Sequence, residues 1–208
     1  LEAGVQDLEI AEGAVRVAGT DKSIDFAALA SLPKASEATL TGQGDFVPPS
    51  ATYPNGTHVA EVEIDPETGI TEVVRYTICD DFGIVVNPLL LAGQVHGGVV
   101  QGIGQALHER TVYDAEGQLL TASFMDYAMP RAGDVPFFHF ETKNVPSTTN
   151  PMGIKGAGEA GSIGSCPAVM NAVVDALDRS VGLRDMDMPA TPARMFAALE
   201  PLRKAAAA

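Results

Sequence analysis

The sequence predicts an α+β fold in which mixed sheets with hairpins pack against helices. Three observations support this class. Alternating apolar and polar residues occur around turn residues at 8–17 and 58–78, apolar residues recur with helical period at 92–109 and 167–177, and strands and helices do not alternate regularly. The 208 residues are 46% hydrophobic but only 6% aromatic, with no Trp. We therefore expect a core built from aliphatic residues and Met.

The N-terminal part combines a hairpin and a short helix. In residues 8–17, apolar residues alternate on both sides of a turn in which Gly13 takes a left-handed conformation. Ser23 is placed to cap a short helix whose apolar face includes Phe26. Residues 41–55 are rich in Gly and Pro, which predicts a connection.

This connection divides the chain into two predicted domains. The first is a hairpin–helix segment, residues 1–45. The second, residues 46–208, carries the remaining elements and the glycine-rich loop described below.

The hairpin at 58–78 has a strong turn signal. Ala60, Val62 and Ile64 share one face of its first strand. In the turn at 65–69, Asp accepts hydrogen bonds, Pro presets φ and Gly takes the left-handed conformation. We expect the second strand, 70–78, to point three apolar side chains inward: Val74, Tyr76 and Ile78.

The helix predicted at 92–109 contains an apolar stripe: Val95, Val99, Ile103 and Leu107. It also contains glycines, at 97, 98, 102 and 104, each of which costs about 1 kcal/mol relative to Ala inside a helix. Two interpretations are open. Another backbone or a ligand approaches closely, with Gln94 and Gln101 contributing amides, or the helix is simply tightly packed and its glutamines are exposed.

Further elements follow in chain order. A hairpin-like unit is expected at 111–120 and a strand at 137–142. For the helix at 167–177 we expect Ser165 or Cys166 as the cap, Pro167 in the first turn and Gly182 as the end. The last helix begins at 191–192, with Phe196 and Leu199 facing inward.

The loop GIKGAGEAG, residues 153–161, is the strongest candidate site. Its four glycines allow close approach of backbone to a ligand, and its one carboxylate belongs to Glu159. Such a loop before a helix can hold an anion on backbone N–H groups and aim a base. A plain turn with a solvated Glu is the simpler interpretation. The spacing Gly156-x-Gly158-x-x-Gly161 also matches a dinucleotide-binding pattern, but proline-containing loop precedes it and the predicted helix begins too late.

Composition excludes several classes of function. The net charge of −14 disfavours binding to nucleic acid or anionic lipid, and the sequence contains no long apolar run. Cys79 and Cys166 form no C-x-x-C pair, and the histidines have no metal-ligand spacing, so we predict no metal ligands. The cysteine content is typical of a reducing, cytoplasmic setting.

Three stretches together resemble the molybdenum hydroxylase family, which includes xanthine dehydrogenase and aerobic carbon monoxide dehydrogenase. They are CDDFGIVVNP (79–88), GQVHGGVVQGIGQAL (93–107) and NPMGIKGAGEAG (150–161). The stretches FMDYAMP (124–130) and DMPATP (187–192) fit the same pattern. The resemblance is to the C-terminal, molybdopterin-binding part of the large subunit, and it assigns both predicted domains to the molybdopterin-binding region.

This resemblance implies roles for nine residues. Glu159 matches the general base. The backbone of Lys155, Gly156, Ala157 and Gly158 would touch the cofactor, and Gln94 would hydrogen-bond the pterin. Near the far end of the dinucleotide would lie Asp80, Val86 and Asn87.

The resemblance also implies cofactors and partners. Molybdenum would be bound by molybdopterin in its cytosine dinucleotide form, with FAD and [2Fe–2S] clusters on partner subunits and the rest of the large subunit completing the site. The reaction would oxidise an aldehyde, an N-heterocycle or a similar small molecule, with water as the oxygen source. The sequence Ala160-Gly161-Ser162 departs from the Ser-Pro of carbon monoxide oxidisers. The chain alone should be inactive, and the alternative is a non-catalytic structural or assembly fragment that binds no cofactor.

Overall fold

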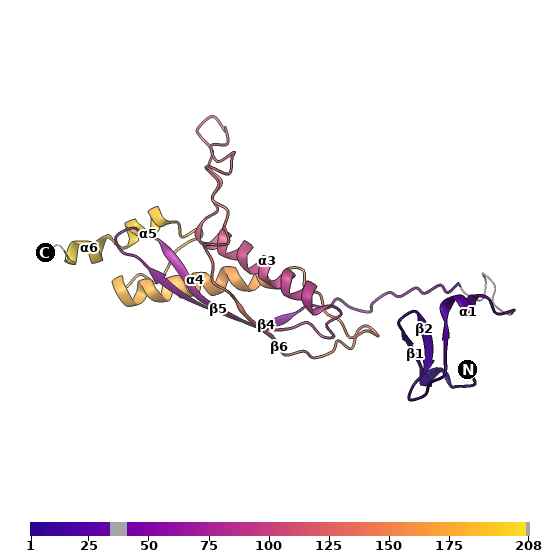
Figure 1. Ribbon diagram of the computed structural model, residues 1–208. Coiled ribbons are helices and arrows are strands. Elements are labelled where there is room, and N and C mark those ends of the chain that lie inside the picture. The colour runs from indigo at the N-terminus through magenta and orange to yellow at the C-terminus, as the bar shows by residue number, and fades with distance from the viewer. Residues whose placement is uncertain (34–40, 207–208) are drawn as a thin grey trace. The chain divides into compact units, whose positions relative to one another are not determined.

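The computed structural model describes residues 1–33 and 41–206 and confirms the α+β class (Figure 1). The described elements are η1 (Val5–Asp7), β1 (Leu8–Ala11), β2 (Ala14–Val17), β3 (Ser23–Asp25), α1 (Phe26–Ala30), β4 (Asn55–Ile64), β5 (Thr71–Asp81), α3 (Pro88–Leu107), β6 (His139–Thr142), α4 (Ala160–Val181), α5 (Pro192–Ala198) and α6 (Glu200–Ala206). None of the helices in these two ranges combines the length and the hydropathy that a membrane span requires.

The chain forms two compact units, Leu1–Val47 and Pro48–Ala208, and each is described by itself. The division into domains at 45/46 stays a prediction, because compactness alone does not define a domain.

The first unit contains an antiparallel sheet with the strand order β1-β2-β3. The predicted hairpin is confirmed, and both its turn residues, Glu12 (φ 51°) and Gly13 (φ 76°), are left-handed. The prediction that Ser23 caps the short helix is wrong, because Ser23 begins β3 and pairs with β2. Asp25 is the cap instead: its Oδ1 accepts a hydrogen bond from the Ala28 N–H at 2.6 Å.

The second unit is built on a sheet with the strand order β4-β5-β6, in which β5 pairs antiparallel with β4 and parallel with β6. The predicted hairpin is confirmed, but Val74 does not point inward. A bulge pairs Glu61 with Arg75 and the next residue with Val73, so Val74 is skipped. As a result Val74 is 38% exposed and Val73 is buried.

Helix α3 follows the predicted period but begins four residues earlier, at Pro88. Asn87 caps it, because its Oδ1 accepts a hydrogen bond from the Leu90 N–H at 3.1 Å. All four residues of the predicted apolar stripe are buried. They face a core that also contains residues of β5, α4 and α5: Tyr76, Ile78, Val169, Val173, Leu177 and Met195.

Helix α4 begins at Ala160, so the prediction of a start beside Pro167 is wrong. Pro167 lies inside the helix, where its missing N–H costs one hydrogen bond. Contact with α3 offsets this loss, since the backbones of the two helices touch. A Cβ added at Gly98 would lie 3.0 Å from the Cα of Gly161, and one added at Gly102 would overlap Ser165. Gly182 ends the helix in the left-handed conformation, as predicted.

The C-terminal helices pack against the turn of the β4–β5 hairpin. Leu199 is buried as predicted, but Phe196 is 42% exposed and lies under the guanidinium group of Arg203. Met195 takes the inward position instead, because the buried face of α5 is offset by one residue. Between α3 and β6 the chain runs as a long loop, in which the expected hairpin at 111–120 is reduced to one bridge, Tyr113 to Leu119 (Figure 1).

Candidate functional site

The glycine-rich loop is anchored at the end of β5. Lys155 donates its N–H to the carbonyl of Phe82 at 3.0 Å, and Ile84 donates its N–H to the carbonyl of Gly153 at 2.9 Å. Gly83 and Ile154 form an isolated antiparallel bridge between the same two segments. Two stretches that are far apart in the sequence are therefore held side by side.

A part-buried ion pair reinforces this anchor. The Nζ of Lys155 lies 2.6 Å from Oδ2 of Asp81, and the two side chains are 15% and 11% exposed. Oδ1 of Asp81 accepts hydrogen bonds from the N–H groups of Gly83 at 2.9 Å and Val145 at 3.0 Å. The hydrogen bond from Lys155, followed by that from Val145, lowers the pKa of Asp81 to about 2. The Lys155 side chain is thus used within the protein, and only its backbone borders the loop.

Gln94 on α3 ties the other end of the loop. Its Nε2 donates a hydrogen bond to the carbonyl of Gly158 at 2.7 Å. No backbone carbonyl in the described residues accepts from the N–H groups of Gly156, Ala157 or Gly158. A Cβ at Gly158 would meet open space, and one at Gly156 only the carbonyl of Thr52 at 4.0 Å. Open N–H donors on an accessible loop fit the polar edge and phosphates of a pterin cofactor.

Glu159 is the N-cap residue of α4. Its carbonyl accepts from the N–H of Ile163 at 3.0 Å, but its side chain makes no capping hydrogen bond. Within the described ranges the carboxylate is exposed and has no hydrogen-bond or ion-pair partner. It is therefore available to a ligand on the loop.

This position also revises one argument against a dinucleotide site of the nicotinamide type. The objection that the helix begins too late is wrong, since α4 follows the glycine loop directly. The objection that no strand precedes the loop holds, because in this stretch the structure has only the single bridge at Ile154.

The remaining predicted residues lie in different surroundings. Val86 is 71% exposed, and Asn87 uses its Oδ1 to cap α3. Asp80 is 3% exposed, and its Oδ2 lies 3.3 Å from Nε2 of His58. The structure thus brings Gln94 to the glycine loop, whereas the carboxylate of Asp80 is turned into the protein.

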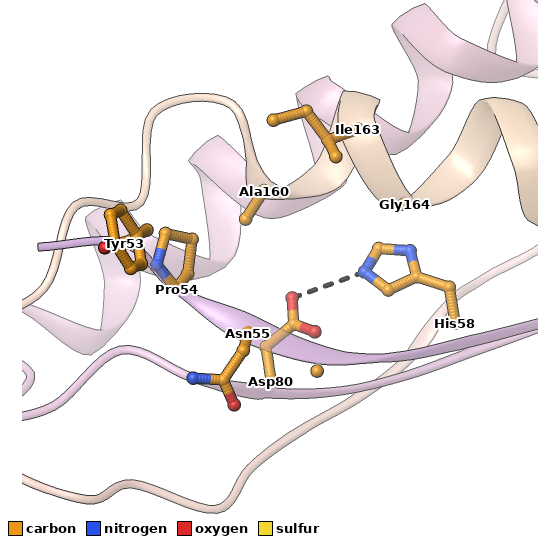
Figure 2. A pocket seen from close by; sticks show the side chains of 9 residues that line it. Tyr53, Pro54, Asn55, His58, Asp80, Ala160, Ile163 and Gly164 are labelled. Atoms are coloured by element: carbon orange, nitrogen blue, oxygen red, sulfur yellow. Dashed lines mark hydrogen bonds and ion pairs between the residues drawn. The ribbon is translucent and has the colours of Figure 1, made fainter.

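A cavity of about 190 Å³ adjoins the first turn of α4 (Figure 2). Its lining residues come from the segment before β4, from β4 itself, from the end of β5 and from α4: Tyr53, Pro54, Asn55, Gly56, His58, Asp80, Ala160, Ile163 and Gly164. His58 and Asp80 are the ionisable residues among them.

Sequence reasoning missed Asp81 and His58. Asp81 follows Asp80 directly, and an adjacent acid pair gives no sign of which acid turns towards the loop. His58 had a detectable signal, because it shares the inward-facing row of β4 with Ala60 and Val62.

Comparison with known proteins identifies the family to which this fold belongs. Residues 1–136 match the family described as "Molybdopterin cofactor-binding domain". The gamma subunit of the 6-hydroxypseudooxynicotine dehydrogenase complex of Paenarthrobacter nicotinovorans is 36% identical over 99% of the chain and 27% of its own length.

Solved structures extend the similarity. A Cu,Mo-CO dehydrogenase matches with a TM-score of 0.79 and 33% identity over 98% of this chain and 26% of its own. Quinoline 2-oxidoreductase from Pseudomonas putida 86 matches with a TM-score of 0.78 and 37% identity over 96% of this chain and 26% of its own. The chain spans about a quarter of the length of these relatives. It belongs to the molybdenum hydroxylase family and carries the molybdopterin cofactor-binding fold of that family's large subunit.

Proposed function

We propose that this chain is part of the catalytic subunit of a molybdenum hydroxylase, and that Glu159 is its general base. One observation carries the proposal: an unpartnered carboxylate stands at the N-terminus of α4, next to three backbone N–H groups that no backbone carbonyl of the described residues occupies. A base and a row of donors are thus placed beside one another on a loop that is anchored at both ends.

Each residue of the loop has a role in this proposal. When bound, molybdenum with molybdopterin supplies the two-electron oxidation. The N–H groups of Gly156, Ala157 and Gly158 bind the polar edge of the cofactor. Gln94 holds one end of the loop by its hydrogen bond to the Gly158 carbonyl, and Lys155 holds the other end by its ion pair with Asp81. Glu159 accepts a proton on a carboxylate oxygen.

For the substrate we propose an N-heterocycle or an aldehyde, oxidised with water as the oxygen source. The names of two relatives, 6-hydroxypseudooxynicotine dehydrogenase and quinoline 2-oxidoreductase, point to nitrogen-containing aromatic substrates for those proteins. The residues Ala160-Gly161 after the glutamate argue against carbon monoxide.

We further propose that the site is completed by other polypeptide. The relatives are about four times as long as this chain. The chain also exposes large apolar side chains in the loop before β6: Phe124 is 79%, Met125 is 96% and Phe137 is 103% exposed. The proposed partners are the rest of the large subunit and the iron–sulfur and FAD subunits. The proposal also includes the cytosine dinucleotide form of the cofactor and a cytoplasmic location. The assignment of residues 1–45 and 46–208 as two parts of the molybdopterin-binding region belongs to it as well.

The test is Glu159→Gln in the complete complex, with Glu116→Gln on an exposed loop as the control. We expect molybdenum and pterin contents near those of the parent enzyme and a turnover lowered by about 10²–10⁴ or more, since Gln cannot accept the proton. Unchanged turnover in Glu159→Gln contradicts the base role. A parent complex without molybdenum and pterin would favour the alternative, a structural or assembly fragment of the same fold.

A further inference from the structure

A buried hydrogen-bonded cluster joins strands β4 and β5 and packs against the backbone of helix α4, and it lies outside the contacts that anchor the glycine loop. Nδ1 of His58 lies 2.8 Å from the hydroxyl oxygen of Tyr76, and Nε2 lies 3.3 Å from Oδ2 of Asp80 (Figure 2 shows the His58–Asp80 pair). The side chains of His58 and Asp80 are 6% and 3% exposed, and Tyr76 is fully buried.

With a neutral imidazole ring, the hydrogen bonds of this cluster have one donor–acceptor order. The carboxylate of Asp80 accepts, so Nε2–H of His58 donates to it. The neutral ring then accepts at Nδ1 from the hydroxyl of Tyr76. Burial, followed by the nearby Asp80 charge, raises the pKa of Tyr76 and keeps the phenol protonated as this donor. Every polar atom that the imidazole ring offers is therefore used.

Two glycines make room for this cluster. A Cβ on Gly164 of α4 would lie 2.5 Å from Cε1 and 2.6 Å from Nδ1 of His58. A Cβ on Gly56 of β4 would collide with Oδ1 of Asp80. The imidazole thus packs directly against the backbone of α4. Gly164 is five residues after Glu159, about 7.5 Å along the helix axis.

We propose that the Tyr76–His58–Asp80 cluster positions Glu159 by fixing the first two turns of α4 over the β4–β5 hairpin. The side chain of Glu159 has no partner of its own among the described residues, and its backbone belongs to the helix that His58 supports. The hydrogen bonds at both ring nitrogens hold the imidazole of His58 in one orientation. Because Gly164 has no Cβ, this ring packs directly on the backbone of α4 and so fixes the position of the helix. His58 is a positioning residue, and this inference rests on the proposed role of Glu159.

The test compares His58→Ala with Val173→Ala in the complete enzyme complex. Val173 is buried on the same helix, nine residues beyond Gly164, so its truncation also loosens the core. In His58→Ala we expect amide hydrogen exchange at 160–165 to become about tenfold faster and exchange at 170–177 to stay unchanged. Val173→Ala should produce the reverse pattern. Turnover per bound molybdenum should fall ten- to hundredfold in His58→Ala with little change in KM, since small misplacement of a catalytic group is costly.

Conservative variants keep the test informative if His58→Ala does not fold. Tyr76→Phe removes only the partner of Nδ1, and His58→Gln retains a donor for Asp80. Both should shift exchange at 160–165 in the same direction by a smaller factor.

The proposal is overturned if exchange at 160–165 rises no more in the His58 and Tyr76 variants than in Val173→Ala. The exchange measurement needs no turnover, so it is independent of the proposed base. Retained activity in Glu159→Gln would refute the general-base function, whereas an inactive Glu159→Gln combined with a normal His58→Ala would refute only the positioning role.

Discussion

Replacing Lys155 by Met should destabilise the folded chain in a pH-dependent way. The Lys155–Asp81 pair is short, at 2.6 Å, and both side chains are almost buried. A hydrogen bond to a charged group contributes about 1.5–3 kcal/mol. Asp81 keeps its bonds from Gly83 and Val145 in the variant, which satisfies part of the carboxylate. We therefore expect a loss of about 2 kcal/mol in the free energy of unfolding at pH 7.

The pH dependence follows from the lowered pKa of Asp81, which is about 2 in the folded chain. An aspartate in an unfolded chain has a pKa of about 3.9. The stabilisation is then fully present above about pH 5 and is lost as the pH falls towards 2. The difference between parent and variant should therefore be smaller at pH 3 than at pH 7.

Urea unfolding of the 208-residue chain at pH 7 and pH 3 measures this difference. Arg179→Met is the matched control, because it breaks the exposed Arg179–Asp175 pair at 3.0 Å and should cost less than about 0.5 kcal/mol. The reasoning is refuted if Lys155→Met costs no more than this control, or if its cost is the same at both pH values.

Two further predictions concern packing and can be measured by the same unfolding experiment. Gly161→Ala would place a Cβ 2.7 Å from the N of Val99 and should lower the free energy of unfolding by about 1–3 kcal/mol. In Gly97→Ala the new Cβ meets nothing within 4 Å, and the variant should stabilise α3 by up to about 1 kcal/mol. Equal effects of the two variants would exclude backbone contact between α3 and α4. Val73→Ala should cost about 2 kcal/mol and Val74→Ala less than about 0.5 kcal/mol, and the opposite order would contradict the bulge in β5.

Local patterns predicted most elements of the fold, and non-local contacts explain the errors. The period of α3 and the turn at 65–69 depend on neighbouring residues, so both are readable from the sequence. The prediction that Val74 points inward failed because Val74 is the extra residue of a bulge in β5, which appears only in the pairing with β4 and not in the alternation of residues along β5.

The start of α4 failed for a related reason. Pro167 and the possible caps beside it are local signals for a helix start. The contact of Gly161 with the backbone of α3 overrides them, and it depends on a helix more than 50 residues away in the sequence. In the candidate site, the role of Glu159 stays a prediction from the motif, and the contacts that Asp81 and Gln94 make with the loop are defined only by the folded structure.

The anchoring of the glycine loop has a consequence for the order of folding. The hydrogen bonds between Phe82 and Lys155 and between Ile84 and Gly153 close a segment of about 70 residues that contains α3 and β6. Closing such a segment costs conformational entropy that local contacts within the loop do not offset. We therefore expect the loop to acquire its shape only after the sheet and α3 have assembled, and a cofactor that depends on this loop to bind a chain that has already folded.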